Sequence, residues 1–150
     1  MAWLIRQAMA GDYDYIADNM RASDRKELFI AHGYGTKKAM DDLRKYPANC
    51  VVIDGEPAIL FGCAFYDNYG VPWMLATNDI RKIPITFVRQ SIPIVQDWLD
   101  IYGYLTNFVY SENEVSLNWL KALGFEIESE FPIGKHIFYK VALGVKPCVT

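Results

Sequence analysis

The residues that could do metal or thiol chemistry are few in this sequence. His32 and His136 are the only histidines, and Cys50, Cys63 and Cys148 are the only cysteines. A protein zinc site takes about four such ligands, usually in pairs that lie a few residues apart. Neither the histidines nor the cysteines have that spacing. The sequence therefore predicts no metal site.

Other candidates for chemistry are also weak. Glu27 and His32 lie on a predicted helix, but a separation of five residues does not bring two side chains to one helix face. We interpret this pair, and the charged run from Arg21 to Glu27, as solvent-facing surface, and Trp73 as part of the core. No Gly-x-Ser-x-Gly or Gly-x-x-x-x-Gly-Lys-[Ser/Thr] motif occurs, so serine-hydrolase and nucleotide-hydrolysis chemistry have no support.

Length and composition are typical of one folded domain spanning residues 1–150. The 150 residues are 52% hydrophobic and 15% aromatic, far from the low hydrophobicity of disordered chains. The formal net charge is −3 and the sequence pI is about 5.3. Without a basic stripe, the chain lacks the electrostatic footprint of a nucleic-acid-binding protein, so nucleic acid is not expected as its main partner.

The cysteines and the first residues indicate the compartment. Three cysteines at wide spacing, two of them in apolar surroundings, predict thiols in a reducing environment rather than a disulfide framework. The start of the chain has neither the basic segment nor the long apolar run of a secretory signal. No stretch approaches the roughly 20 apolar residues that cross a bilayer. We therefore expect no secretion by a signal peptide and no membrane span.

The first half of the chain predicts one strand, three helices and a hairpin. Residues 3–7 form the strand, and Asp12, Ser23 and Thr36 are each placed to cap the start of a helix. Two β-rich runs within residues 49–65 surround the Asp54-Gly55 pair, which tolerates the positive φ that tight hairpin turns require.

The second half of the chain predicts a strand at residues 71–77, three further strands and two helices. The apolar run 71–77 is too short for a stable helix and predicts a central strand. Residues 84–100 have helical spacing, and Pro93 should kink or split that helix. Strand 104–110 is followed by a helix from Asn113 to Leu123, and strands 125–131 and 135–141 end the chain. The apolar face of the last helix is predicted to contain Val115, Trp119, Ala122 and Leu123. This order predicts an α/β domain with a mixed sheet.

The last helix carries a recognisable motif. Asn113, Ser116, Trp119, Gly124 and Phe125 are similar to the closing motif of the GNAT acetyltransferase superfamily, Asn-x-x-Ala-x-x-Leu-Tyr-x-x-x-Gly-Phe. The resemblance implies a GNAT-like acyl-CoA N-acyltransferase fold, with a mixed, mostly antiparallel sheet flanked by helices. It also implies an acetyl-CoA site where two central strands splay apart and a helix N-terminus receives the pyrophosphate.

The resemblance places that cofactor site on particular residues. Ala76 and Thr77 end the predicted central strand, and Arg81 and Lys82 lie in the segment equivalent to the family's phosphate loop. Asn113 is the first residue of the closing motif. These five residues are the expected cofactor-binding positions.

Two departures from the family pattern bear on catalysis. Leu120 stands where a tyrosine often protonates the departing thiolate, which leaves Tyr110 or Ser111, or water, as the proton source. The phosphate loop reads from Arg81 to Thr86, with Pro84 and Thr86 in place of two small residues. Proline removes one backbone N–H donor. We therefore expect no bound cofactor, or acetyl-CoA only if the phosphate loop still works.

More narrowly, nearly the whole chain resembles a phage family that includes the internal virion protein A of short-tailed phages. Four segments carry the resemblance: residues 20–33, 53–62, 71–80 and 105–128. The resemblance implies degenerate catalysis and a role in virion assembly, genome delivery or contact with a host protein. The partner would be a phage virion or host protein, and the location the host cytoplasm or the virion. The alternative is an acetyl-CoA-dependent N-acetyltransferase with an altered phosphate loop.

Overall fold

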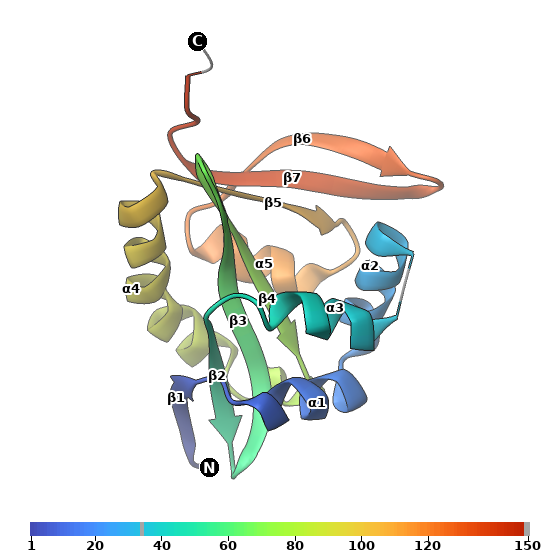
Figure 1. The fold of residues 1–150 in the computed structure, drawn as a ribbon, viewed down its shortest axis with the longest axis vertical. Coiled ribbons are helices and arrows are strands. Elements are labelled where there is room, and N and C mark those ends of the chain that lie inside the picture. Colours follow the sequence, from blue (N-terminus) through green and yellow to red (C-terminus); the bar gives the residue numbers. More distant parts are fainter. Residues whose placement is uncertain (34, 149–150) are drawn as a thin grey trace. The chain divides into compact units, whose positions relative to one another are not determined.

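A computed structural model describes residues 1–33 and 35–148. Seven strands form a mixed sheet in the order β1-β2-β3-β4-β5-β7-β6 (Figure 1). The β1–β2, β2–β3, β5–β7 and β6–β7 pairs are antiparallel, and the β4–β5 pair is parallel. The predicted fold class, a mixed and mostly antiparallel sheet flanked by helices, is confirmed.

The chain divides into two compact units. The first comprises Met1–Ala64 with Trp73–Pro84, and the second comprises Phe65–Pro72 with Ile85–Thr150. Strand β3 (Glu56–Tyr66) and strand β4 (Tyr69–Ala76) each contribute residues to both units.

The first unit contains β1 (Trp3–Gln7), β2 (Ala48–Ile53) and most of β3. The predicted hairpin between β2 and β3 is confirmed, since Asp54 and Gly55 both have positive φ, 49° and 84°. Such a pair of left-handed residues matches the twist of antiparallel strands joined by a two-residue turn. Buried β2 and β3 side chains supply much of the core, among them Val51, Ile53, Ile59, Leu60 and Phe61.

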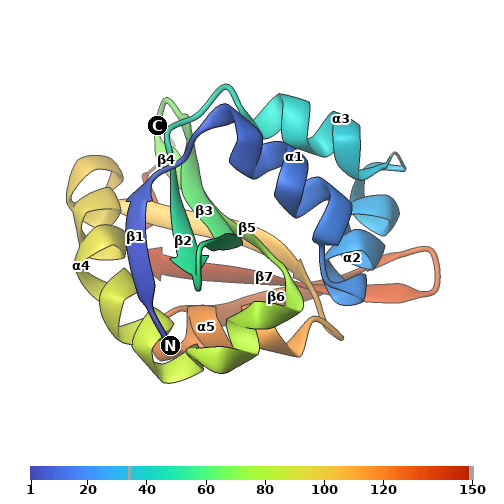
Figure 2. The same ribbon diagram turned by 90° about the horizontal axis from the view of Figure 1, so that it is seen from below.

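Three helices lie side by side in the first unit (Figure 2): α1 (Ala10–Asn19), α2 (Ala22–His32) and α3 (Thr36–Leu43). All three helices were predicted, but all three predicted caps are wrong. Thr36 is the first residue of α3, which begins after Gly35. Asp12 is the third residue of α1 and Ser23 the second of α2, because the helices begin after Met9 and Arg21. Gly33 ends α2 in the left-handed conformation with φ 70°, as a C-terminal glycine typically does.

The second unit is built on β5 (Tyr104–Tyr110), β6 (Glu126–Ile133) and β7 (His136–Gly144), with helices α4 (Pro84–Tyr102) and α5 (Glu114–Ala122). All of these elements were predicted. Pro93 was expected to kink or split helix α4. The helix is continuous through Pro93, so the predicted split is wrong. Its residue Pro84 belongs to the first unit.

The buried face of α5 differs from the predicted face. Trp119 is buried, as predicted, but Val115 is half-buried and Ala122 is exposed. Ser116, Leu117 and Leu120 are buried instead. Hydrophobic periodicity counts apolar residues only, so it does not predict the burial of small, polar Ser116.

Candidate functional site

The end of strand β4 is the first place where cofactor residues were predicted. The Thr77 N–H donates to the carbonyl of Ala58 on β3 at 2.8 Å. Backbone groups of successive strand residues point to opposite edges. The N–H and C=O of Ala76 therefore point to the edge of β4 that does not face β3.

Both backbone groups of Ala76 are already hydrogen-bonded on that edge. Its N–H donates to Asp24 Oδ2 at 3.0 Å, and its carbonyl accepts from the N–H of Arg21 at 2.9 Å. The junction of α1 and α2 thus binds the edge of β4 much as a neighbouring strand would. We call Arg21, Asp24 and Ala76 the edge cluster.

A buried ion pair holds the edge cluster together. Arg21 Nη2 lies 2.7 Å from Asp24 Oδ1, and Arg21 Nε lies 3.2 Å from Asp24 Oδ2. Arg21 is 3% exposed and Asp24 is fully buried, so the interpretation of this charged run as solvent-facing surface is wrong for both. Their shared partner, Ala76, lies 52 residues beyond Asp24, a contact that the local charge pattern does not contain.

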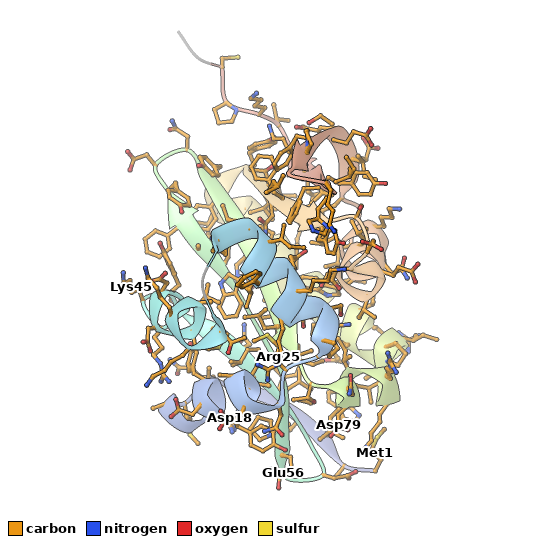
Figure 3. The ribbon with its side chains drawn as sticks, turned by 90° about the vertical axis from the view of Figure 1, so that its right-hand side faces the viewer. Met1, Asp18, Arg25, Lys45, Glu56 and Asp79 are labelled. Carbon is orange, nitrogen blue, oxygen red and sulfur yellow. The ribbon has the colours of Figure 1, made fainter. Side chains whose placement is uncertain are left out.

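The neighbouring Arg25, labelled in Figure 3, ties α2 to the end of α1. Its Nη2 donates to the carbonyl of Ala17 at 2.8 Å, and its Nε donates to the carbonyl of Met20 at 3.3 Å. These bonds satisfy carbonyls at a helix end that have no partner within the helix. They also hold in place the junction that supplies Arg21 and Asp24.

The segment equivalent to the phosphate loop forms a short 3₁₀ helix, η1 (Asn78–Lys82), followed by α4. Thr77 caps η1 by accepting from the Asp79 N–H at 3.2 Å. Arg81 and Lys82 are exposed, and Lys82 Nζ lies 3.4 Å from Asp79 Oδ1.

The backbone of this segment offers few donors to an anion. The Ile83 N–H donates to the carbonyl of Ile80 at 3.3 Å, and Pro84, the first residue of α4, has no N–H. The two side-chain cations are therefore the main anion-attracting groups at Asn78–Pro84.

Tyr110, a candidate proton donor, ends β5 in a hydrogen-bonded cluster. Its hydroxyl donates to Glu112 Oε2 and lies 3.2 Å from His136 Nδ1, and its ring is 2% exposed. A tyrosine between a carboxylate and an imidazole can exchange a proton with either. Ser111 is half-buried, and its N–H donates to the carbonyl of Ile137 at 2.9 Å.

Asn113 and Leu120, both singled out in the closing motif, are buried. Asn113 precedes the first turn of α5 and is fully buried, and its carbonyl accepts from the Leu117 N–H at 3.1 Å. Leu120 is 3% exposed. The motif therefore packs α5 into the core of the second unit.

Where β4 runs beside β5 in the second unit, a side chain enters the ladder. The parallel pairing joins Gly70 to Leu105, and the next carbonyl on this edge, that of Pro72, accepts from Asn107 Nδ2 at 2.7 Å. A regular parallel ladder would use a backbone N–H here. The Asn107 amide thus replaces a backbone donor.

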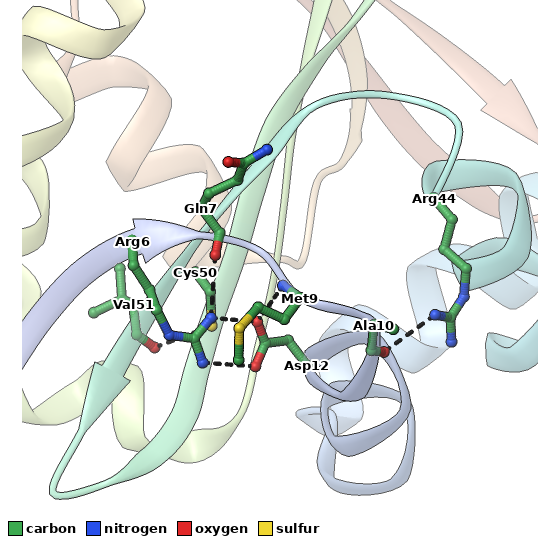
Figure 4. Close-up of polar contacts among 8 residues, drawn as sticks. All are labelled: Arg6, Gln7, Met9, Ala10, Asp12, Arg44, Cys50 and Val51. Atoms are coloured by element: carbon green, nitrogen blue, oxygen red, sulfur yellow. Dashed lines mark hydrogen bonds and ion pairs between the residues drawn. The ribbon is translucent and has the colours of Figure 1, made fainter.

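A second polar cluster, partly buried and in the first unit, joins β1 to α1 (Figure 4). Arg6 donates to both carboxylate oxygens of Asp12, at 2.6 and 2.9 Å, and the Met9 N–H donates to Asp12 Oδ2 at 2.7 Å. The hydrogen bonds from Arg6 lower the pKa of Asp12, and the Met9 bond lowers it further. Burial raises the pKa of the Cys50 thiol to about 12, with Asp12 adding to the shift. A protonated thiol beside a fully bonded carboxylate indicates a structural role.

Other site types find little support among residues 1–33 and 35–148. No group of three or more histidine, cysteine, aspartate or glutamate side chains in this part of the chain could hold a metal ion. None of its helices is long and apolar enough to cross a membrane. Cys50 and Cys63 are buried free thiols, and Cys148 is an exposed one.

Comparison of the sequence with known families and curated proteins finds no match, whereas comparison of the structure finds many. The PaiA N-acetyltransferase of Thermoplasma acidophilum, solved with coenzyme A, matches with a TM-score of 0.70 and 12% identity over 97% of this chain and 100% of that one. The ribosomal-protein-S18-alanine N-acetyltransferase of Escherichia coli matches with a TM-score of 0.68 and 12% identity over 99% and 97%. YncA of Salmonella typhimurium, solved with its cofactor acetyl-CoA, matches with a TM-score of 0.62 and 13% identity over 100% and 98%.

These matches cover almost the full length of both chains, at identities that show the fold alone. The chain therefore has the fold of the GNAT acetyltransferases.

Proposed function

We propose that this chain keeps the GNAT fold without acetyl transfer and acts by contact with a protein partner. The observation that carries the proposal is the edge cluster. The Ala76 backbone, on the strand where cofactor binding is expected, is hydrogen-bonded to Asp24 and Arg21 instead.

The residues present do not fit acetyl-CoA well. A ligand at Ala76 would have to displace a buried carboxylate, which would leave the Arg21 guanidinium without a partner that it now contacts at 2.7 Å. Breaking a buried pair in this way costs about 3–5 kcal/mol. The start of α4 adds little in return, because Pro84 lacks an N–H. Asn113, which precedes α5, is fully buried.

The resemblance to phage internal virion proteins gives the proposed role its context. We propose a part in virion assembly, genome delivery or contact with a host protein, in the host cytoplasm or the virion. If this is right, mass spectrometry of purified particles of the encoding phage should detect the chain at constant stoichiometry. Its complete absence from particles would leave only the host-protein role.

An acetyl-CoA-dependent N-acetyltransferase is the second candidate. The solved neighbours favour it, since two of them contain acetyl-CoA or coenzyme A. The Tyr110 cluster also favours it, because Tyr110 bonded to Glu112 and His136 offers the proton donor that Leu120 cannot.

Calorimetric titration with acetyl-CoA separates the two candidates. At physiological salt we expect no binding tighter than roughly 100 µM, equivalent to about −5.5 kcal/mol, because exposed cations are screened and costly to order. The Arg81→Ala variant should then show the same lack of acetyl-CoA binding as the unmodified chain. Low-micromolar binding that is abolished by Arg81→Ala, and retained by Arg89→Ala as an exposed control on α4, would put the acetyltransferase first.

A further inference from the structure

The second unit contains a hollow of about 520 Å³ that the proposed function does not use. Aromatic rings dominate its walls. Tyr66 lies at the end of β3, Tyr69 at the start of β4, and Tyr104 and Phe108 on β5. Small-molecule sites typically have volumes of about 300–1,000 Å³ and mainly apolar or aromatic walls. We call this hollow the aromatic pocket.

The strand register helps to keep one side of the pocket open. Tyr104, Thr106 and Phe108 alternate along β5 and share one face of the sheet. Their partners on β7 are Gly144, Ala142 and Lys140. The side chain of Ala142 is a single methyl group, so β7 places little bulk beside Thr106. The position that a Cβ of Gly144 would take is occupied by the Gly103 carbonyl and by Leu99 Cδ1, so Gly144 leaves no space of its own.

Exposed rings make the pocket walls available to a ligand. Tyr66 and Tyr69 stack with their ring centres 5.0 Å apart and their planes 18° apart. Tyr66 is 52% exposed and Phe108 is 51% exposed. Exposed, stacked aromatic faces favour a planar apolar ring as the contacting group.

Two lysines give the pocket a positive charge. Lys140 and Lys146 both line it. Lys140 Nζ lies 3.3 Å from Glu128 Oε2, and the Tyr104 hydroxyl donates to the same carboxylate at 3.3 Å. Burial is the largest single influence on the pKa of Lys140 and lowers it, but the hydrogen bond with Glu128 and the charge interactions with Glu128 and Tyr104 together outweigh burial. The net shift of this pKa is upward, so the ammonium stays charged.

Glu128 offsets the charge of Lys140 and leaves Lys146 as the uncompensated cation among the lining residues. Lys146 follows Val145, whose N–H donates to the carbonyl of Gly103 at 3.0 Å. That bond fixes the backbone beside the pocket. The local charge thus suits a ligand with a single negative charge.

We propose that the aromatic pocket binds a small planar monoanion, an aromatic carboxylate. Its ring packs against Tyr66, Tyr69 and Phe108, and its carboxylate pairs with Lys146. The site is independent of acetyl-CoA and of the edge cluster.

Fluorescence and NMR titrations with 2-naphthoate and the uncharged 2-naphthamide test this proposal on the full chain. We expect naphthoate to bind at least about fivefold more tightly than naphthamide, the size of one exposed charge pair. Shifted amide signals should come from Tyr69, Phe108 and Lys146.

Three exposed-residue variants show where the probe binds. Phe108→Ala should weaken both probes about tenfold through lost ring contact. Lys146→Gln should remove the preference for naphthoate, and Lys135→Gln, an exposed lysine in the β6–β7 turn, should leave it unchanged. Equal binding of both probes, absence of binding at about 1 mM, or binding that ignores Phe108→Ala and Lys146→Gln would each overturn the proposal.

Discussion

At the scale of single residues, Asp24 determines the character of the β4 edge. One carboxylate satisfies the Arg21 guanidinium and the Ala76 N–H together. The sequence predicted Ala76 as a site residue through the family resemblance. It gave no sign of Arg21 and Asp24, because the contact between distant segments depends on how α1 and α2 meet the strand. A charged run that also forms a buried pair looks the same in sequence as a solvent-facing one.

Removing Asp24 should therefore be costly. Asp24→Ala breaks the buried ion pair with Arg21 and removes the acceptor of the Ala76 N–H, so we expect the free energy of unfolding to fall by about 3–5 kcal/mol. Asp18→Ala, an exposed aspartate on α1 labelled in Figure 3, should change it by less than about 0.5 kcal/mol. Urea denaturation measures both. A loss below about 1 kcal/mol for Asp24→Ala would show that the ion pair contributes little.

Trp119 is the residue through which α5 packs on α4. Its ring stacks on Phe87 at a centroid distance of 5.5 Å, and its Nε1 donates to Ser91 Oγ at 3.0 Å. Trp119→Ala should lower the free energy of unfolding by about 3–5 kcal/mol through lost burial and a cavity. Trp119→Phe keeps a ring but loses the hydrogen bond, so it should cost about 1–2 kcal/mol. If denaturant titrations showed that both variants lose the same free energy of unfolding, ring packing would not be the larger contribution of Trp119.

The three thiols should differ sharply in reactivity. Burial raises the pKa of Cys50 from 9.0 to about 12, which lowers its thiolate fraction about a thousandfold. In native protein at pH 8, an aromatic disulfide reagent should label exposed Cys148 within seconds to minutes and leave Cys50 unlabelled. In denaturant all three cysteines should react. Rapid labelling of native Cys148→Ser would mean that the buried thiols are accessible.

At the scale of elements, hydrophobic periodicity and turn chemistry predicted every long helix and strand, and the exact helix starts depended on tertiary contacts. Asp12 does accept a backbone N–H, but from Met9, while Arg6 holds the same carboxylate. The partner on β1 thus favours a helix that begins at Ala10. Local capping signals could not reveal this, because they contain no information about β1.

Pro93 tests whether tertiary packing maintains a helix at a residue that locally disfavours helical structure. It interrupts the hydrogen bonding of α4 at an exposed position, yet the helix continues. Pro93→Ala restores a donor to the Arg89 carbonyl, so we expect the free energy of unfolding to rise by about 1–3 kcal/mol. Gln90→Ala, exposed on the same helix, should change it by only a few tenths of a kcal/mol. Destabilisation by Pro93→Ala in thermal and urea unfolding would mean that packing requires the proline.

At the scale of the whole molecule, element order was enough to predict the fold class, and the division into two compact units was not predictable. A linker usually marks such a division through glycine, proline or polar residues. Here β3 and β4 each belong partly to both units, so the boundaries fall inside apolar strands. Sequence patterns that identify a strand give no sign that its two ends belong to different units.

The shared strands lead to a prediction about cooperativity. If one unit unfolded alone, β3 and β4 would have to fray partway along their length. This fraying would expose the buried residues Leu60 and Ala76. It would also break ladder hydrogen bonds without releasing the rest of each strand. Each lost ladder hydrogen bond costs roughly 0.5–1.5 kcal/mol, and the strand that stays folded regains little chain entropy in return, so we expect one transition. Heteronuclear NMR spectra recorded in increasing urea would follow the native amide signals of Leu60 in the first unit and Val141 in the second. Their midpoints should agree within about 0.2 M, whereas a separation above about 0.5 M would show two independently unfolding domains.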